Sequence, residues 1–546
     1  MLRPVCFIVA SLLISFAWLS PFHIYPWVTF SSELASFGAG LALLPLLFSQ
    51  NIRIARAQIW MLFIVFIPLL QWGFGLVEDF SVVFLSASYL FMFWLLIVCG
   101  YQLSQQPQRR QQLMQGFSYV VVGSAFMSAL MAIVQGLNLE SSLIGIMQLK
   151  GSRPYANFGQ PNNLATFLII GLMGALYLYE QHKAKLWLLL PTSLIILFAI
   201  CLTQSRTSWL VGIFIIFYWL YKQYKKQPRL HYAKLLIWAA LYFVIAGYLL
   251  PIIMHMMATD AGAHVVHTAS VIERAGKGHE RIGMWIQILH AIAERPWLGY
   301  GWNQTSIAVV ESIHFNTIQV WFNSAHNVFL DILVWNGIPL GGLIIAYMTL
   351  WLLWLNHNAK DKVSIIAILM VSAILIHAIL EFPQRYACFL LPMGFLLGII
   401  QAQTPDLKGI AIPQALFRCM WLVVVVLLLL VWRDYRVYQA NSQLLFKGQV
   451  PSKSVLGSSK ILLLTQFQQR LDWLELNPKT QMSDQELLKW HEMVENKATP
   501  YNLQKYAQLL IYNNQVSEAK RYILVLNQLY RKDVDVEKLI EKYQKK

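Results

Sequence analysis

Charged side chains are scarce in this chain of 546 residues: Asp, Glu, Lys and Arg make up 12% of it, against roughly a quarter of an average soluble protein. Hydrophobic residues make up 57%. They gather in runs of about twenty, the length that a helix needs to cross the hydrocarbon layer of a bilayer. This composition excludes a cytosolic enzyme, a disordered chain and a secreted protein held together by disulfides. We therefore predict an all-α, polytopic membrane protein.

Cysteine pairs and metal-ligand clusters are also missing from the pattern. No two cysteines form a CxxC pair, and all five lie within or at the edge of apolar runs: Cys6, Cys99, Cys201, Cys388 and Cys419. Disulfides and zinc knuckles do not fit this distribution. His264 and His267 have the spacing of metal ligands on a helix, but no third ligand accompanies them. We expect no bound metal and no cofactor.

The net charge of +16 would suit a nucleic-acid partner until the basic residues are mapped. Eighteen of the 42 Lys and Arg residues follow residue 432, and most others lie in short loops between apolar runs. Basic loops on one side of a membrane set the topology of a polytopic protein. The charge therefore indicates membrane topology, and we expect no nucleic acid.

Hydropathy predicts about thirteen transmembrane helices. The first apolar run lacks a small-residue cleavage site, so we interpret it as a retained helix and not a signal peptide. Alternate loops hold the excess of Lys and Arg, which places the N-terminus inside the cell and the C-terminus outside. The predicted spans lie near residues 5–20, 34–49, 58–77, 80–101, 117–137, 163–180, 186–203, 207–221, 235–253, 327–355, 363–382, 386–402 and 419–432.

Two long segments lie outside the membrane in this topology. Residues 254–326 form a loop between two spans, and residues 433–546 form a soluble tail rich in Lys, Gln, Glu and Leu. Ser483 with Glu486 predicts a capping box in the tail, and Thr499 before Pro500 predicts a helix N-cap. We expect a transmembrane domain over 1–432 and a small helical domain over 433–546.

Polar residues that border membrane spans are costly, and they are therefore candidates for function. Four such places fall on the predicted outer side. Each has an ordinary structural explanation: an arginine at a tight turn, a helix cap, an interfacial histidine, or a His–Glu pair within the bundle. The candidates are Arg206 in a polar hexad, the segment 153–163, the loop residues Arg281 and His326, and His377 with Glu381 and Arg385.

Taken together, these side chains suit a particular chemistry. The guanidinium groups of Arg153, Arg206, Arg281 and Arg385 match the geometry of phosphate oxygens. A neutral histidine such as His326 can remove the proton of a hydroxyl group. Group transfer with a phosphate leaving group, from a donor held in the membrane, fits this combination.

The chain also resembles the bacterial O-antigen ligase superfamily, and within it the protein O-oligosaccharyltransferases. The resemblance covers nearly the whole chain, including the soluble tail. It rests on Pro21-Phe22-His23-x-x-Pro26-Trp27-x-x-Phe30-x-x-Glu33, on Gly159-Gln160-Pro161-Asn162-x-Leu164-Ala165-Thr166, on Glu280-Arg281, on Arg295-Pro296-Trp297-Leu298-Gly299-x-Gly301, on His326-Asn327 and on His377-x-x-x-Glu381-Phe382-Pro383.

The resemblance implies a donor oligosaccharide on undecaprenyl pyrophosphate and an acceptor Ser or Thr hydroxyl on a periplasmic protein such as a pilin. The enzyme would lie in the bacterial inner membrane with its active site facing the periplasm, without metal or cofactor. By the same resemblance His326 is the base, and Arg281 and Arg206 bind the donor pyrophosphate. Supporting roles fall to Arg153, Gln160, Asn162, Asn327, His377, Glu381 and Arg385.

Three alternatives share part of this pattern. An O-antigen ligase acting on lipid A core, or a polymerase of repeat units, would carry the same His and Arg residues. The N-terminal motif and the long tail favour the protein ligase by resemblance. A membrane transporter is more remote, because transporters place polar groups near the bilayer midplane and often contain repeated halves.

Overall fold

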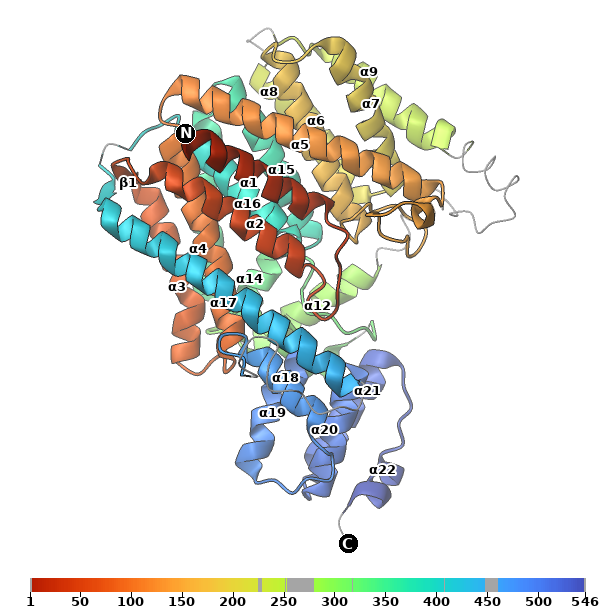
Figure 1. Ribbon diagram of the computed structural model, residues 1–546. Helices are drawn as coiled ribbons and strands as arrows, with labels where there is room; N and C mark the ends of the chain where they lie inside the picture. Colours follow the sequence, from red (N-terminus) through yellow and green to blue (C-terminus); the bar gives the residue numbers. More distant parts are fainter. Residues whose placement is uncertain are drawn as a thin grey trace. The chain divides into compact units, whose positions relative to one another are not determined.

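The computed structural model describes residues 2–223, 228–250, 252, 279–316, 318–406, 408–446 and 460–544, which are mostly helical (Figure 1). The α-helices are α1 (Leu2–Leu19), α2 (Phe30–Leu43), α3 (Arg56–Gly73), α4 (Phe80–Leu103), α5 (Pro107–Gly136), α6 (Pro161–Glu180), α7 (Leu186–Thr203), α8 (Arg206–Gln223), α9 (Tyr232–Val244), α12 (His279–Glu294), α13 (Thr305–Glu311), α14 (Val328–Asn358), α15 (Lys362–Leu380), α16 (Ala387–Gln401), α17 (Gln414–Phe446), α18 (Thr465–Glu475), α19 (Asp484–Asn496), α20 (Pro500–Tyr512), α21 (Val516–Tyr530) and α22 (Val536–Tyr543).

Short elements connect some of these helices. Two three-residue strands, β1 (Ile52–Ile54) and β2 (Ile410–Ile412), pair antiparallel with Ile52 opposite Ile412. The single-turn helices are η1 (Leu44–Leu47), η2 (Glu140–Ser142), η5 (Ile313–Phe315) and η6 (Pro383–Arg385), and the π-helical turn η3 (Ile245–Leu249) extends α9.

Every predicted span falls on a helix of the described chain. Among the described residues, ten helices are long and apolar enough to cross a membrane. Two shorter apolar helices, Pro4–Leu19 and Ala387–Gln401, and the helix α8 account for the other three predicted spans. The structure therefore confirms an all-α polytopic membrane protein, and the count of thirteen crossings stays a prediction.

The chain divides into two compact units, each built from separate stretches of sequence. Unit 1 comprises Met1–Met61, Met92–Gly276 and Leu350–Leu422. Unit 2 comprises Leu62–Phe91, Lys277–Thr349 and Val423–Lys546.

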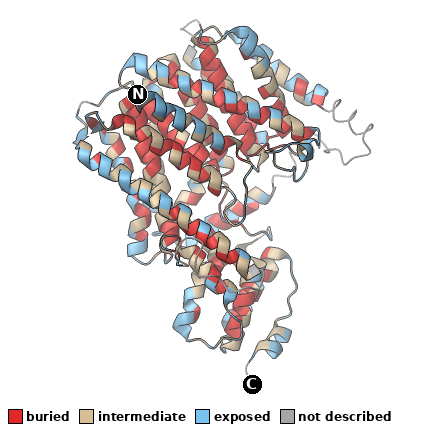
Figure 2. Ribbon diagram, in the orientation of Figure 1, coloured by how far each residue is buried: buried red, intermediate tan, exposed pale blue. Residues whose placement is uncertain are grey.

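Helices α6 and α15 form the centre of unit 1. Most residues of their apolar stretches are buried (83% in α6 and 72% in α15), whereas α9 buries only Leu235 among its described residues (Figure 2). Helix α6 packs against α5, α7 and α15, and α15 packs in turn against α8 and α16. Polar side chains on α6 and α15 are therefore withdrawn from lipid and need partners within the protein.

The tail and the long loop share one hydrophobic core in unit 2. This core joins Ile288 of α12, Val309 of α13 and Val334 of α14 to Leu510 of α20 and Ile523 of α21. Helices from both segments thus bury their apolar faces against each other.

The predicted helix starts in the tail are confirmed. Ser483 and Glu486 form a capping box at α19, with the side chain of each accepting from the backbone of the other. The Thr499 side chain accepts from Asn502 N at the start of α20, where Pro500 occupies the first turn.

A glycine contact fixes the Arg-Pro-Trp-Leu-Gly segment against a kink in α14. Gly337 breaks the helix with φ +71°, and Gly299 has φ +68°. A Cβ on Gly299 would lie 2.6 Å from Gly337 N, so neither backbone leaves room for a side chain. Tyr300 N and Ile338 N donate to Val334 O (2.8 Å) and Pro296 O (2.7 Å) across this contact.

Candidate functional site

Asn162 is the centre of a polar group at the ends of three helices of unit 1. Its Oδ1 accepts from Arg153 Nη2 (3.1 Å) and from Ser205 Oγ (2.8 Å), and its Nδ2 donates to Glu381 Oε1 (3.3 Å). Asn162 lies on the first turn of α6, Ser205 precedes α8, and Glu381 is the C-cap residue of α15. The structure thus brings together Arg153, Asn162 and Glu381, which the sequence predicts from separate motifs.

Local backbone signals place these side chains. Pro161 at the first position of α6 suits a helix start, since its missing N–H would have no partner there. Helix α7 ends on Gln204 in the left-handed conformation (φ +48°), which turns the chain directly into Ser205 and Arg206. Arg206 is therefore the first residue of α8 and is exposed.

The two arginines of this group differ in what holds them. Arg153 Nε donates to Thr203 O (2.8 Å), one of the terminal carbonyls of α7, and Nη2 is bonded to Asn162. A guanidinium at a helix C-terminus also meets the negative end of the helix dipole. Arg153 thereby joins the ends of α7 and α6, whereas Arg206 is an exposed residue at the N-terminus of α8.

His377 lies deeper in the same unit. It is fully buried, and its Nδ1 lies 2.9 Å from Thr166 Oγ1 of α6. Glu381 N donates to His377 O (2.8 Å), which closes the last turn of α15. Arg385 on η6 lies over the ring of Phe382, 5.8 Å from its centroid. These contacts tie the late motif to α6, the helix that carries Asn162.

The N-terminal motif packs against the second motif. A Cβ on Gly159 would lie 3.8 Å from the His23 ring, and the neighbouring Gln160 is the N-cap residue of α6. Glu33 is 4% exposed, and its Oε2 accepts from Ala387 N (2.7 Å) at the start of α16. Burial lowers the pKa of His23, which favours the neutral imidazole.

The other group of predicted residues lies in unit 2, on the turn before α14. His326 has φ +53°, a conformation that costs a residue with a side chain about 1–3 kcal/mol. The turn is held from both sides: His326 N donates to Ser324 Oγ (3.2 Å), and Trp285 Nε1 of α12 donates to Ala325 O (2.9 Å). Backbone strain that persists in this way is common at functional sites.

Asp331 holds this turn, and the sequence analysis missed it. The side chain is 1% exposed. Its Oδ1 accepts from Ala325 N (2.8 Å) and Thr305 Oγ1 (3.0 Å), and its Oδ2 accepts from Ser324 Oγ (2.6 Å). The signal was available, because an acidic residue one turn inside an apolar span needs buried partners.

Asn327 and Arg281 have different environments in unit 2. Asn327 Oδ1 accepts from Phe329 N (3.0 Å) and Leu330 N (3.2 Å), so Asn327 acts as the N-cap of α14. Arg281 is on the first turn of α12, the helix whose Trp285 contacts the His326 turn, and is partly exposed.

The tail supports the segment that precedes the His326 turn. Gln304 Nε2 donates to Glu492 Oε1 (2.7 Å), and Ser306 Oγ donates to Glu495 O (2.6 Å). Burial raises the pKa of Glu492 and of Glu495 to about 7. Because Gln304 and Ser306 flank the Thr305 that bonds Asp331, α19 is connected to the turn through α13.

Metal ligands do not cluster in the part of the chain that the structure describes. No group of three or more His, Cys, Asp or Glu side chains there could hold a metal ion. His264 and His267, the residues with ligand spacing, lie outside the described residues.

The predicted site residues are thus divided between the units. Unit 1 supplies Arg153 and Glu381, which are both hydrogen-bonded to Asn162, and also Arg206 and Arg385 at other helix ends; guanidinium groups suit an anionic ligand. Unit 2 supplies the histidine on a strained turn. Unit 1 holds Arg153, Gln160, Asn162, Arg206, His377, Glu381 and Arg385, and unit 2 holds Arg281, His326 and Asn327.

The fold and these residues define a polytopic, all-α membrane protein with ionisable side chains concentrated at helix ends. Three family models match it: O-Antigen ligase over residues 191–345, Virulence factor membrane-bound polymerase, C-terminal, over 365–539, and Protein glycosylation ligase over 154–179. The protein glycosylation match contains the motif that begins at Gly159 and carries Asn162.

Two curated relatives come from Acinetobacter baylyi. The chain is 50% identical to its General O-oligosaccharyltransferase over 538 residues, which are 98% of this chain and 94% of the relative. It is 29% identical to the ComP-specific O-oligosaccharyltransferase over 357 residues, 65% of this chain and 63% of that one. The chain therefore belongs to the O-oligosaccharyltransferase family and is a glycosyltransferase of protein O-glycosylation, as the resemblance in its motifs predicted.

Proposed function

We propose that this enzyme transfers an oligosaccharide en bloc from undecaprenyl pyrophosphate to Ser or Thr hydroxyls of periplasmic proteins, pilins or other exported proteins. The site faces the periplasm from the bacterial inner membrane. The observation that carries the proposal is the His326 turn: a strained backbone, fixed by a buried carboxylate, presents a partly exposed imidazole beside a helix that bears Arg281.

In the proposed reaction His326 accepts the hydroxyl proton as the acceptor oxygen bonds to the anomeric carbon of the first sugar. The bond between that carbon and the pyrophosphate oxygen breaks, and undecaprenyl pyrophosphate leaves. Arg281 and Arg206 bind the pyrophosphate and stabilise the negative charge that develops on it. Their planar guanidinium groups can each bond two phosphate oxygens.

The other predicted residues act on these groups. Arg153 and Glu381 position Asn162, because both are hydrogen-bonded to it. Asp331 is a positioning residue for His326, because its carboxylate accepts hydrogen bonds from the Ser324 side chain and the Ala325 backbone, directly before His326. Asn327 sets the start of α14.

A comparison of two histidine substitutions tests the proposal. In cells supplied with a lipid-linked glycan and an exported acceptor, His326→Ala should lower the rate of glycan addition by about 10²–10⁴. His314→Ala is the matched control, because His314 is in the same unit and its side chain is 58% exposed. The acceptor's mass reports transfer directly.

The outcomes separate the alternatives. A glycan-sized mass gain with the intact chain and with His314→Ala, but not with His326→Ala, supports both the reaction and the base. Glycan on lipid A core in place of protein would favour the lipid ligase. Full transfer by His326→Ala would refute the assigned base and leave the reaction standing.

A further inference from the structure

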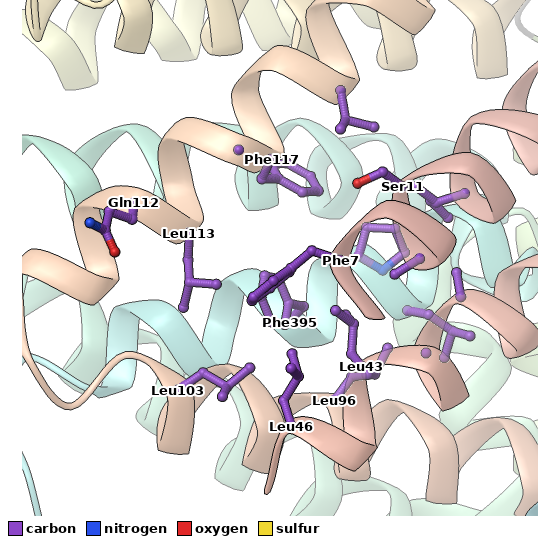
Figure 3. A pocket seen from close by; sticks show the side chains of 18 of the residues that line it. Phe7, Ser11, Leu43, Leu46, Leu96, Leu103, Gln112, Leu113, Phe117 and Phe395 are labelled. Carbon is purple, nitrogen blue, oxygen red and sulfur yellow. The ribbon is translucent and has the colours of Figure 1, made fainter. Parts of the chain in front are cut away.

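An apolar cavity lies in unit 1, between the N-terminal parts of α1 and α5. Its volume is about 440 Å³, and α2, α4 and α16 complete its wall. Figure 3 shows Phe7, Phe117 and Phe395 around the space, with Gln112 at one side. Apolar cavities of about 150 Å³ stay dry and take up benzene. This cavity has room for a considerably larger hydrocarbon group.

One end of the cavity is polar and cationic. Arg109 and Gln112 of α5 line it, together with Gln50. Arg109 is exposed, and within the described part of the chain no carboxylate forms a salt bridge with it, whereas its neighbour Arg110 is paired with Asp361. A free guanidinium beside two amides suits a phosphate group.

The cavity is remote from the proposed catalytic residues of the same unit. It adjoins Gly116 near the start of α5, and the far end of that helix carries Gln135, whose Oε1 accepts from Tyr155 N (2.9 Å) and Ala156 N (2.7 Å) in the segment before Asn162. Nineteen residues of helix separate Gly116 from Gln135, about 30 Å along the axis, which is the thickness of the hydrocarbon layer. The spacing along α5 therefore assigns the cavity to the leaflet opposite the donor pyrophosphate.

We propose that this cavity binds one acyl chain of an anionic phospholipid, with the lipid phosphate on Arg109. An apolar slot that ends in a cation matches such a lipid, and basic pockets between membrane helices are typical sites for anionic head groups. The charge on Arg109 selects an anionic over a zwitterionic lipid, because a net negative head group retains attraction that an internal ammonium cancels. This site is independent of the transfer reaction.

Native mass spectrometry of the full chain tests the proposal. The purified protein is offered equal amounts of phosphatidylglycerol and phosphatidylethanolamine with identical acyl chains. We expect preferential retention of phosphatidylglycerol. Arg109→Gln should lower its retention about tenfold, the effect of losing one charge-assisted hydrogen bond. Lys185→Gln, which removes an exposed charge from a different loop of the same unit, should have no such effect.

A pair of glycines tests the cavity itself. Gly116 lines the space and a Cβ there meets no atom within 4 Å, so the backbone admits a side chain at this position; we expect Gly116→Leu to occupy part of the cavity and also to favour the helix. Gly123 on the same helix is exposed, is equally open and does not line the cavity. Gly116→Leu should lose both lipids, and Gly123→Leu should retain phosphatidylglycerol. Equal retention of the two lipids or unchanged binding by Gly116→Leu would overturn the proposal. So would preferential retention of a polyprenyl phosphate over phosphatidylglycerol when the two are offered together in a second mixture.

Discussion

Replacing Asp331 with Ala should disable His326 without touching it. The carboxylate is 1% exposed and accepts three hydrogen bonds, from Thr305, Ser324 and Ala325. A buried donor without an acceptor costs about 1–3 kcal/mol, and Asp331→Ala leaves three such donors. Their combined cost exceeds the strain of about 1–3 kcal/mol that the hydrogen bonds to Asp331 maintain in the backbone of His326. The turn is then expected to relax.

The expected effect on catalysis follows from geometry. A displacement of about 1 Å in a reacting group can reduce the rate about 10²-fold. Asp331→Ala should therefore lower the maximal rate of transfer by about that factor, with little change in the KM for the lipid-linked donor. Asp331→Asn should retain most activity, because its oxygen can accept from Ala325 and its amide can donate to Ser324.

A double-mutant comparison separates positioning from general damage. On the His326→Ala background, Asp331→Ala should have no further effect on residual transfer, since both act through the same imidazole. Trp335→Phe is the matched control: it removes the bond from Trp335 Nε1 to Thr305 Oγ1 (2.7 Å) and leaves Ser324 and Ala325 bonded to Asp331. Wild-type transfer by Asp331→Ala, or an equal loss on both backgrounds, would refute the reasoning.

Three further outcomes are expected. Arg206→Lys keeps the charge but loses the two-pronged contact with phosphate, so kcat/KM for the lipid-linked donor should fall about tenfold in a transfer assay, and an unchanged value would exclude Arg206 from donor binding. Burial raises the pKa of Glu492 from 4.5 to about 7, so this side chain ionises at a lower pH in the unfolded chain than in the folded protein. The free energy of unfolding therefore falls by at most about 3 kcal/mol as the pH rises from about 4.5 to 7. Glu492→Gln should therefore raise the apparent Tm at pH 8 and leave it nearly unchanged at pH 4.5, whereas a loss at pH 8 would contradict this. Gly299→Ala forces a Cβ to within 2.6 Å of Gly337 N at φ +68° and should lower the free energy of unfolding by more than about 1 kcal/mol in thermal denaturation, a result that wild-type stability would disprove.

Helix positions followed from the sequence because hydrocarbon imposes a simple rule. A spanning segment must satisfy its backbone internally and expose apolar side chains, so each apolar run of sufficient length becomes a helix. Helix α8 shows that the rule holds even for a weak signal: it lies between Arg206 and Lys222 and contains tyrosines and tryptophans, yet the predicted span 207–221 coincides with it.

The candidate residues followed from a related rule: polar groups at the ends of membrane spans are energetically costly, and they are therefore candidates for function. That rule found Asn162, Glu381 and His326 but not the partners between them. Asn162 and Glu381 are 219 positions apart in the chain, and Thr305 and Asp331 are 26 positions apart. Hydrogen bonds of this kind depend on tertiary packing, which cannot be predicted from the spacing of residues in the sequence.

The tail was harder to interpret, because its helices were predicted but their partner was not. An isolated helix pair leaves an apolar face uncovered. Here α12 and α13 provide the missing surface, and these two helices of the loop in turn pack against the tail. The sequence of one segment shows that it has an apolar face, but it does not show which other segment covers that face.

This shared core has a consequence for engineering. Residues 62–91, 277–349 and 423–546 form one folding module from three stretches of sequence. Exchanging the tail alone between two relatives would join mismatched halves of a hydrophobic core, and the chimera would fail for reasons of packing and not of acceptor recognition. A transplant intended to alter the choice of acceptor has to move all three stretches together, with four of the five junctions inside α3, α4, α14 and α17.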